Sequence, residues 1–177
     1  MATVLVVDDT AVDRKLAGGL LARTEAIEVS YAENGKEALE MISAVVPDLV
    51  VTDLQMPEMD GLELVTAISE QYPQVPVLLM TAMGSENAAA QALANGAASF
   101  VPKSDLAASL VDTVMHILEI SDSDSRYKKL IACTTKTDFE FELPNDPSVV
   151  DPLIEMIQQI AVSQGFIPQN SRVQMAV

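Results

Sequence analysis

Cysteine, basic residues and long apolar runs are scarce or missing in this sequence of 177 residues. The single cysteine, Cys133, excludes a disulfide within the chain and any metal site built from several cysteines. Ten basic residues stand against 26 acidic ones, and the net charge of −16 repels phosphate backbones, so no direct binding of nucleic acid is expected. No apolar run approaches the ~18 residues of a membrane span, and no basic segment followed by an apolar one opens the chain. These absences predict a soluble, cytoplasmic protein without a membrane segment.

Apolar residues are plentiful, and their spacing predicts a regular alternation of strands and helices. They make up 49% of the sequence while charged residues make up 20%, so the chain can form a packed core. Short apolar runs predict buried parallel strands at 3–7, 28–32, 49–53, 77–81 and 99–101. Helical spacing of apolar residues predicts helices after Thr10, Asn34-Gly35 and Asp60-Gly61, and at 85–95 and 105–120.

This alternation predicts a doubly wound α/β domain, with a flavodoxin-like (βα)5 parallel sheet, over residues 1–121. The strand order common to such folds is 2-1-3-4-5, which places the first and third strands side by side. The polar stretch 122–129 is expected to be a linker, and its start could also be a frayed helix end. Residues 130–177 then predict a partial second domain, a ββα extension with strands at Leu130–Thr135 and Phe139–Leu143.

Acidic residues follow two strands that are expected to be neighbours in the sheet. Asp8 and Asp9 follow the first strand directly, and Asp53 ends the third. Three carboxylates at one edge would repel one another, and a hard divalent cation such as Mg²⁺ would resolve this repulsion. Thr81 ends the fourth strand and Lys103 follows the fifth, so a hydroxyl and an ammonium reach the same edge. An acid nucleophile, a metal, a hydroxyl and an ammonium together predict phosphoryl transfer.

The chain resembles the response regulator receiver domain of two-component signalling, through motifs that match in order and spacing over residues 1–120. These motifs are Asp8-Asp9, Asp53, Met56-Pro57, Asp60-Gly61, Thr81-Ala82, Phe100 and Lys103. The resemblance implies that Asp53 accepts a phosphoryl group from a histidine kinase or a phosphotransfer protein. It also implies that Asp9, Asp53 and the backbone carbonyl of Gln55 bind Mg²⁺ directly, and that Asp8 binds it largely through water.

The same resemblance implies a switch built from Thr81 and Phe100. Thr81 would turn toward the phosphoryl group while the ring of Phe100 moves inward. The change would be transmitted to the face formed by helix 85–95, strand 99–101 and helix 105–120, which would regulate an output domain and could mediate a homodimer. We therefore expect a phosphoacceptor signalling domain rather than a turnover enzyme.

A second resemblance concerns the C-terminal part of the chain. Its start resembles an anti-sigma-factor-type serine kinase, of the histidine-kinase-like ATPases, in the stretches 139–147 and 172–177. This implies an output in sigma or anti-sigma regulation. The Glu and Asn that hold Mg-ATP in that family do not occur before Val177, so we expect no ATPase or kinase activity from this chain.

Three other functions are alternatives to the phosphorylation switch. An aspartate-nucleophile phosphatase usually has an acid two residues after its nucleophile, and Gln55 occupies that position here. A flavin or dinucleotide module needs a phosphate-binding loop rich in Gly or Ser/Thr after the first strand, where Asp8-Asp9 has the wrong charge. A receiver that docks partners without being phosphorylated stays open. His116 is expected to be a surface residue and not a phosphodonor.

Overall fold

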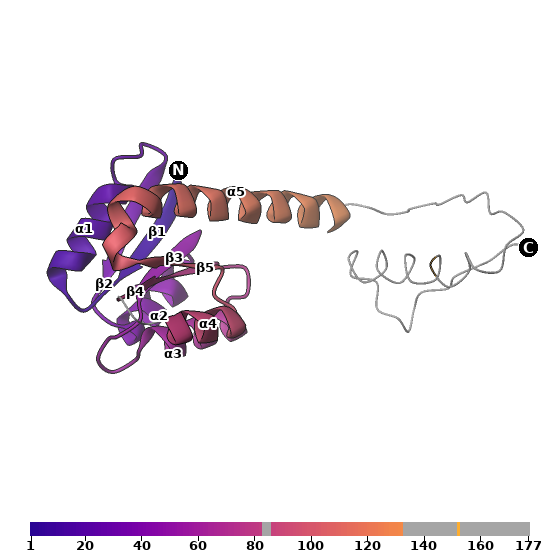
Figure 1. Ribbon diagram of the computed structural model, residues 1–177. Coiled ribbons are helices and arrows are strands. Elements are labelled where there is room, and N and C mark those ends of the chain that lie inside the picture. Colours follow the sequence, from indigo (N-terminus) through magenta and orange to yellow (C-terminus); the bar gives the residue numbers. More distant parts are fainter. Residues whose placement is uncertain (83–85, 133–151, 153–177) are drawn as a thin grey trace, which may run out of the picture. The chain divides into compact units, whose positions relative to one another are not determined.

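A five-stranded parallel sheet in the order β2-β1-β3-β4-β5 lies at the centre of the fold (Figure 1). The computed structural model describes residues 1–82, 86–132 and 152. The strands are β1 (Ala2–Val7), β2 (Ile27–Ala32), β3 (Leu49–Asp53), β4 (Val77–Thr81) and β5 (Ser99–Pro102). β3 and β4 are buried at every position, as expected of parallel strands that are covered on both faces. The predicted fold class and strand order are confirmed.

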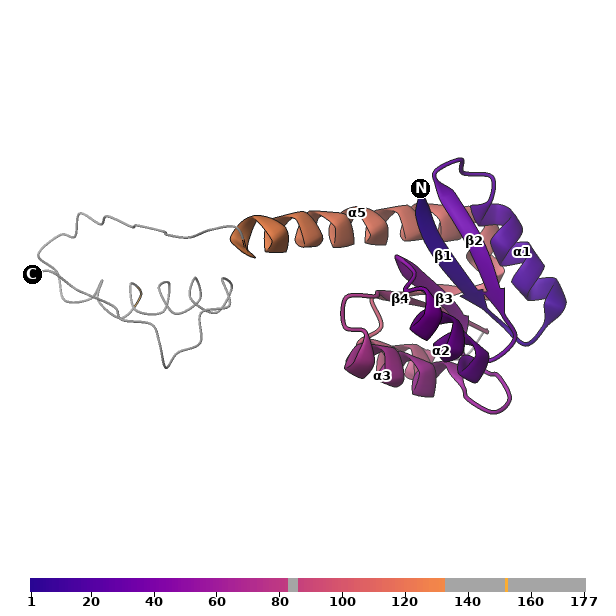
Figure 2. The same cartoon turned by 180° about the vertical axis from the view of Figure 1, so that it is seen from behind.

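Helices cover both faces of this sheet and form a separate core on each (Figures 1 and 2). They are α1 (Ala11–Leu21), α2 (Gly35–Ala44), α3 (Gly61–Gln71), α4 (Glu86–Ala94), a single 3₁₀ turn η1 (Lys103–Asp105) and α5 (Leu106–Ala132). Buried residues of α1 and α5 pack on one face, and those of α2, α3 and α4 pack on the other. This double cover leaves the carboxyl ends of the strands as the open edge of the sheet.

The start of α3 holds the loop after Asp53 in place. The side chain of Asp60 accepts a hydrogen bond from the Glu63 amide at 2.8 Å, and the Glu63 side chain accepts one from the Asp60 amide at 3.0 Å. This reciprocal cap fixes the first turn of the helix. Gly61 is required next to it, because a Cβ at this position would collide with the Asp53 carbonyl oxygen. The loop therefore returns closely against the end of β3.

Two of the predicted helix faces are wrong in part. Helical spacing of apolar residues after Thr10 includes Val12 and Leu16 and predicts that they face the core, but these residues are 73% and 50% exposed. The buried face of α1 is formed instead by Ala17, Gly18, Leu20 and Leu21. Helical spacing also places Val45 on the same side of α2 as Ala38 and Ile42, but Val45 is the residue that ends this helix and is 72% exposed. Small residues at 17 and 18 let α1 approach the sheet closely, which apolar spacing does not reveal.

The linker predicted at 122–129 is helical, because α5 continues without a break to Ala132. The stretch contains neither Gly nor Pro to end a helix, so its polar composition is compatible with a continuing helix. The strand predicted from Leu130 is wrong for its first three residues, which belong to α5. The chain divides into two compact units, 1–122 and 123–177. The rest of the predicted ββα extension, 133–177, lies outside the described residues except for position 152.

None of the helices in the described ranges combines the length and the apolar composition that crossing a membrane requires.

Candidate functional site

Strand register brings the predicted site residues to the same edge of the sheet. Val7 of β1 lies opposite Thr52 of β3, so Asp8 and Asp53 each follow one member of this pair. Asp53 in turn pairs with Met80, which precedes Thr81. Thr81 pairs with Pro102, directly before Lys103. The parallel register thus places groups that are far apart in the sequence along one edge.

Asp8, Asp9 and Asp53 form an acidic cluster, with one oxygen from each carboxylate within 4.8 Å of the others. Asp8 is fully buried and Asp53 is 7% exposed, whereas Asp9 is exposed. One oxygen of Asp8 accepts a hydrogen bond from the Thr10 amide at 2.8 Å. The predicted convergence of these three acids at the end of the first and third strands is therefore confirmed as geometry.

Lys103 supplies the positive charge of this cluster. Its ammonium lies 2.9 Å from an oxygen of Asp8, 3.1 Å from Asp53 and 3.0 Å from Asp13. The Lys103 side chain is 23% exposed, so these contacts are only partly screened by water. An ammonium has three N–H donors, and here each of them has a carboxylate within hydrogen-bond distance.

Burial shifts the ionisation of both central groups. Burial raises the pKa of Asp53 above its usual value of 3.8, and the charge of Asp8 adds to this rise while Lys103 opposes it. Burial by itself would lower the pKa of Lys103. Hydrogen bonds to Asp8 and Asp13 and the charge of Asp53 outweigh that effect and raise the pKa of Lys103 above its usual value. Lys103 is therefore a permanent cation at neutral pH.

Two residues of α1 belong to this site although the sequence did not single them out. Asp13 contacts Lys103, and Arg14 donates to the backbone carbonyl of Asp8 at 2.5 Å and to Glu33 at 2.7 Å. Arg14 thus ties the β1–α1 loop to the loop that precedes α2. A signal was present, because both residues lie in the first turn of the helix that follows Asp8-Asp9. Only the path of α1 over the sheet decides which side chains of that turn reach Lys103.

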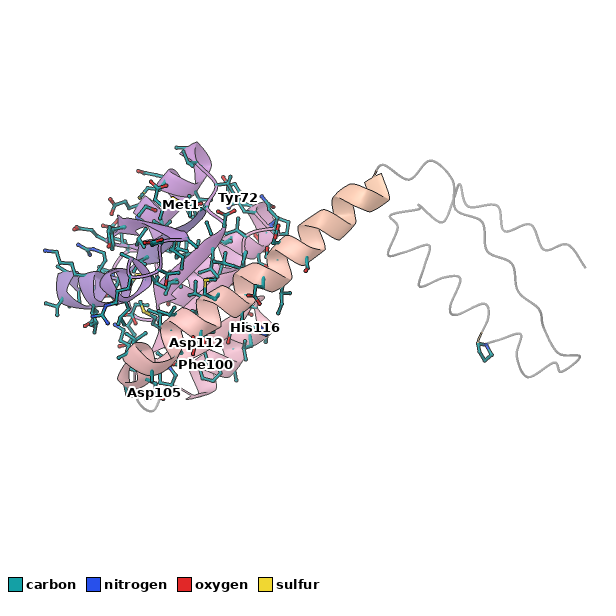
Figure 3. All side chains as sticks on the ribbon, turned by 90° about the horizontal axis from the view of Figure 1, so that it is seen from above. Met1, Tyr72, Phe100, Asp105, Asp112 and His116 are labelled. Atoms are coloured by element: carbon teal, nitrogen blue, oxygen red, sulfur yellow. The ribbon has the colours of Figure 1, made fainter. Side chains whose placement is uncertain are left out.

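The remaining predicted residues differ in how far they are buried. Thr81 is 4% exposed at the end of β4, whereas the ring of Phe100 on β5 is 40% exposed. In the view of Figure 3, Phe100 lies along the same border of the molecule as Asp112 and His116 of α5. His116 is exposed, as predicted. Gln55 is exposed too, and it lines an open cleft of about 730 Å³ together with Asp9, Leu54, Met56, Pro57, Asp60 and Leu62.

Comparisons with known proteins match the part of the chain that carries this site. A family model described as the response regulator receiver domain matches residues 4–115. The chemotaxis protein CheY of Listeria monocytogenes is 36% identical over 103 residues, which cover 58% of this chain and 87% of CheY. The receiver domain of NtrX from Brucella abortus has a similar structure, with a TM-score of 0.63 and 33% identity over 66% of this chain and 98% of that domain.

A longer protein is also similar. The protein-glutamate methylesterase/protein-glutamine glutaminase of Nocardioides sp. is 45% identical over 103 residues, or 56% of this chain. The matched stretch spans 28% of the length of that enzyme. The similarity therefore covers a minor part of the methylesterase.

Proposed function

The chain belongs to the response regulator receiver domain family, and on this premise we propose that it is a phosphorylation switch whose phosphoacceptor is Asp53. A histidine kinase or a phosphotransfer protein donates the phosphoryl group, and the phosphorylated chain regulates an output domain. The observation that carries the proposal is the 3.1 Å contact between the nearly buried Asp53 carboxylate and the Lys103 ammonium, beside two further acids. A carboxylate nucleophile in such surroundings suits attack on phosphorus.

The proposed transfer needs no group that the chain lacks apart from the donor and a cation. An oxygen of Asp53 attacks the phosphorus atom of the phosphohistidine, and a new O–P bond forms as the P–N bond breaks. The electron pair of the broken bond stays on the imidazole nitrogen of the donor. The Lys103 ammonium lies 3.1 Å from Asp53, which supports a role in offsetting negative charge on the phosphoryl oxygens.

The acidic cluster fits a Mg²⁺ site, in which Asp8, Asp9, Asp53 and the backbone carbonyl of Gln55 would hold the ion. Lys103 can offset only one of the three negative charges of this cluster, and hard oxygen donors are the ligands that Mg²⁺ prefers. Asp9 is exposed beside an open cleft, which leaves room for water ligands. Asp8 already accepts hydrogen bonds from Lys103 and Thr10, which favours a contact through water. When bound, the ion would neutralise charge on the phosphoryl oxygens.

The proposed readout uses Thr81 and Phe100. Thr81 would hydrogen-bond to the phosphoryl group, and the Phe100 ring would leave its exposed position and move inward. The contrast between a buried hydroxyl and a 40% exposed ring supports this direction of movement. The rearranged face would consist of α4, β5 and α5. The proposal extends to a homodimer formed through the same face.

The proposed output is a C-terminal domain that begins within residues 130–177 and resembles a histidine-kinase-like ATPase of the anti-sigma-factor type. Support for this part comes from the sequence of stretches 139–147 and 172–177. Reading the coding DNA past the codon for Val177 tests it. An open frame that supplies a Glu and an Asn within the next helical turns would support the assignment, and a stop codon would exclude it.

Phosphorylation itself is tested by incubating the chain with Mg²⁺ and acetyl phosphate and recording its mass. The wild type and the control Asp112→Asn, an exposed acid on α5, should both gain the mass of one phosphoryl group. Asp53→Asn should gain none. A wild-type chain without the gain, or a gain that survives Asp53→Asn, would contradict the proposal.

The same samples distinguish the two competing functions. Continued release of phosphate from simple phosphate esters over many turnovers would favour a phosphatase. A receiver that docks partners without phosphorylation predicts that beryllofluoride, an analogue of the phosphoryl group, leaves the NMR shifts of α4, β5 and α5 unchanged. The proposed switch predicts that these shifts move.

A further inference from the structure

Asp13 holds one of the three donors of the ammonium on which the proposed phosphoryl transfer depends. Its carboxylate lies 3.0 Å from the Lys103 ammonium, as close as the two acids of the central cluster. Asp13 comes from the first turn of α1 and Lys103 from the start of η1, 90 residues later. Of its three N–H groups, Lys103 uses two in hydrogen bonds to Asp8 and Asp13, and it forms an ion pair with Asp53.

We propose that Asp13 is a positioning residue that acts through Lys103, holding the ammonium beside Asp53 and moderating the charge it offers to a phosphoryl group. The inference rests on the proposed role of Asp53 as the phosphoacceptor. Asp13 itself does not touch the reacting atoms. It adds a further negative charge around a single ammonium, so the positive potential felt by an incoming phosphoryl group is lower than Lys103 alone would supply.

The contact between Asp13 and Lys103 is informative because the position of Asp13 does not require it. Its side chain is 36% exposed at the surface of α1, so the carboxylate could point into water. A simpler role also exists, since an acid in the first turn of a helix interacts favourably with the helix dipole. That role concerns the stability of α1 and predicts no change in the binding of ions at the Asp53 site.

The proposed role predicts effects of opposite sign on cations and on phosphoryl groups. The negative charge of Asp13 attracts Mg²⁺ to the acidic cluster and repels a phosphoryl group from Asp53. Replacing Asp13 by asparagine keeps the size of the side chain and an oxygen that can accept from Lys103, but removes the charge. A change that only loosened the site would instead weaken the binding of both.

In the reaction used for the test, acetyl phosphate donates the phosphoryl group. An oxygen of the Asp53 carboxylate attacks phosphorus and forms the new O–P bond, while the bond from phosphorus to the acetyl oxygen breaks. The electron pair leaves with acetate, and no proton is taken up or released. Lys103 keeps its proton throughout.

The test compares the wild type, Asp13→Asn, Asp13→Glu and the charge-matched control Asp112→Asn. Calorimetric titration with Mg²⁺ gives the affinity for the cation. Mass spectrometry at saturating Mg²⁺ gives the rate of phosphorylation by acetyl phosphate. Asp13→Asn should bind Mg²⁺ about threefold more weakly and be phosphorylated about threefold faster, as expected for one partly exposed charge. Asp13→Glu, which keeps the charge, should return both values toward the wild type, and Asp112→Asn should change neither.

Each alternative outcome has a distinct meaning. If Asp13→Asn weakens Mg²⁺ binding and slows phosphorylation together, or changes neither, the inference about Asp13 is wrong while Asp53 remains the phosphoacceptor. If the wild type and every variant fail to gain a phosphoryl group, the proposed function is wrong, and the inference falls with it. Thermal melting of Asp13→Asn shows whether any loss reflects unfolding, and Asp13→Glu then decides the role of the charge.

Discussion

Replacing Lys103 by methionine removes the cation that three carboxylates share and keeps most of the apolar stem. Removing one partner of a fully buried ion pair typically costs about 3–5 kcal/mol, whereas exposed pairs contribute about 0–1 kcal/mol. Lys103 lies between these limits, because it is 23% exposed and contacts a fully buried Asp8. We therefore expect the free energy of unfolding to fall by about 2 kcal/mol at neutral pH without Mg²⁺.

The size of this loss should depend on pH. Burial raises the pKa of Asp53 above 3.8, and Lys103 opposes that rise, so the variant should have a still higher pKa at Asp53. Between the unfolded and the folded pKa the folded state holds a proton that the unfolded state has lost, so stability falls as pH rises through this window. In Lys103→Met this pH window extends to higher pH, because the pKa of Asp53 in the folded state is higher. The deficit relative to the wild type should accordingly be smallest near the unfolded pKa of Asp53 and largest at neutral pH.

Urea unfolding followed by circular dichroism measures this deficit. With a slope of about 2 kcal/mol/M, the neutral-pH midpoint should fall by roughly 1 M, and the shift should shrink at about pH 5. Mg²⁺ should also reduce the shift, because a cation in the acidic cluster replaces part of the missing charge. Lys36→Met is the control: Lys36 pairs with Glu58 at 3.3 Å, but both side chains are more than half exposed, so little change is expected. A loss of stability in Lys103→Met that depends on neither pH nor Mg²⁺ would refute the electrostatic reasoning.

Two further predictions concern backbone positions and are measured by the same urea unfolding. Gly18 and Gly19 both lie within α1; Gly19→Ala should stabilise the fold by about 0.5–1 kcal/mol, since nothing lies near an added Cβ. Gly18→Ala should stabilise less or destabilise, because its Cβ collides with the ring of Tyr31, and equal gains at both positions would contradict this. Glu58 has a φ of 68°, a left-handed conformation that asparagine adopts more easily than alanine. Glu58→Asn should therefore be more stable than Glu58→Ala by about 0.5 kcal/mol. Equal stability of the two variants would contradict strain at this residue.

The acidic cluster was predictable because the chemistry and the local pattern agree. An apolar run that ends in an acid identifies both a buried parallel strand and the group that it delivers to the edge of the sheet. Asp8 and Asp53 each follow or end such a run, and Lys103 follows another. The polar stretch after Ile120 was less predictable, because a polar composition suits both a linker and the end of a helix. Nothing in the stretch stops a helix, and α5 continues through it.

The sequence by itself determined the alternation of strands and helices and the residue types at each strand end, because periodicity and strand termini are local properties. Only the tertiary structure decided how α1 lies over the sheet. That path turns Asp13 toward Lys103, brings Gly18 against Tyr31 and leaves Val12 and Leu16 in water. Apolar spacing predicts that a helix has a buried face, but the rotation of the helix and its approach to the sheet depend on contacts with strands far away in the sequence. The same long-range contacts bring three acids to the Lys103 ammonium, since Asp8 and Asp13 lie 95 and 90 residues away from Lys103 in the chain.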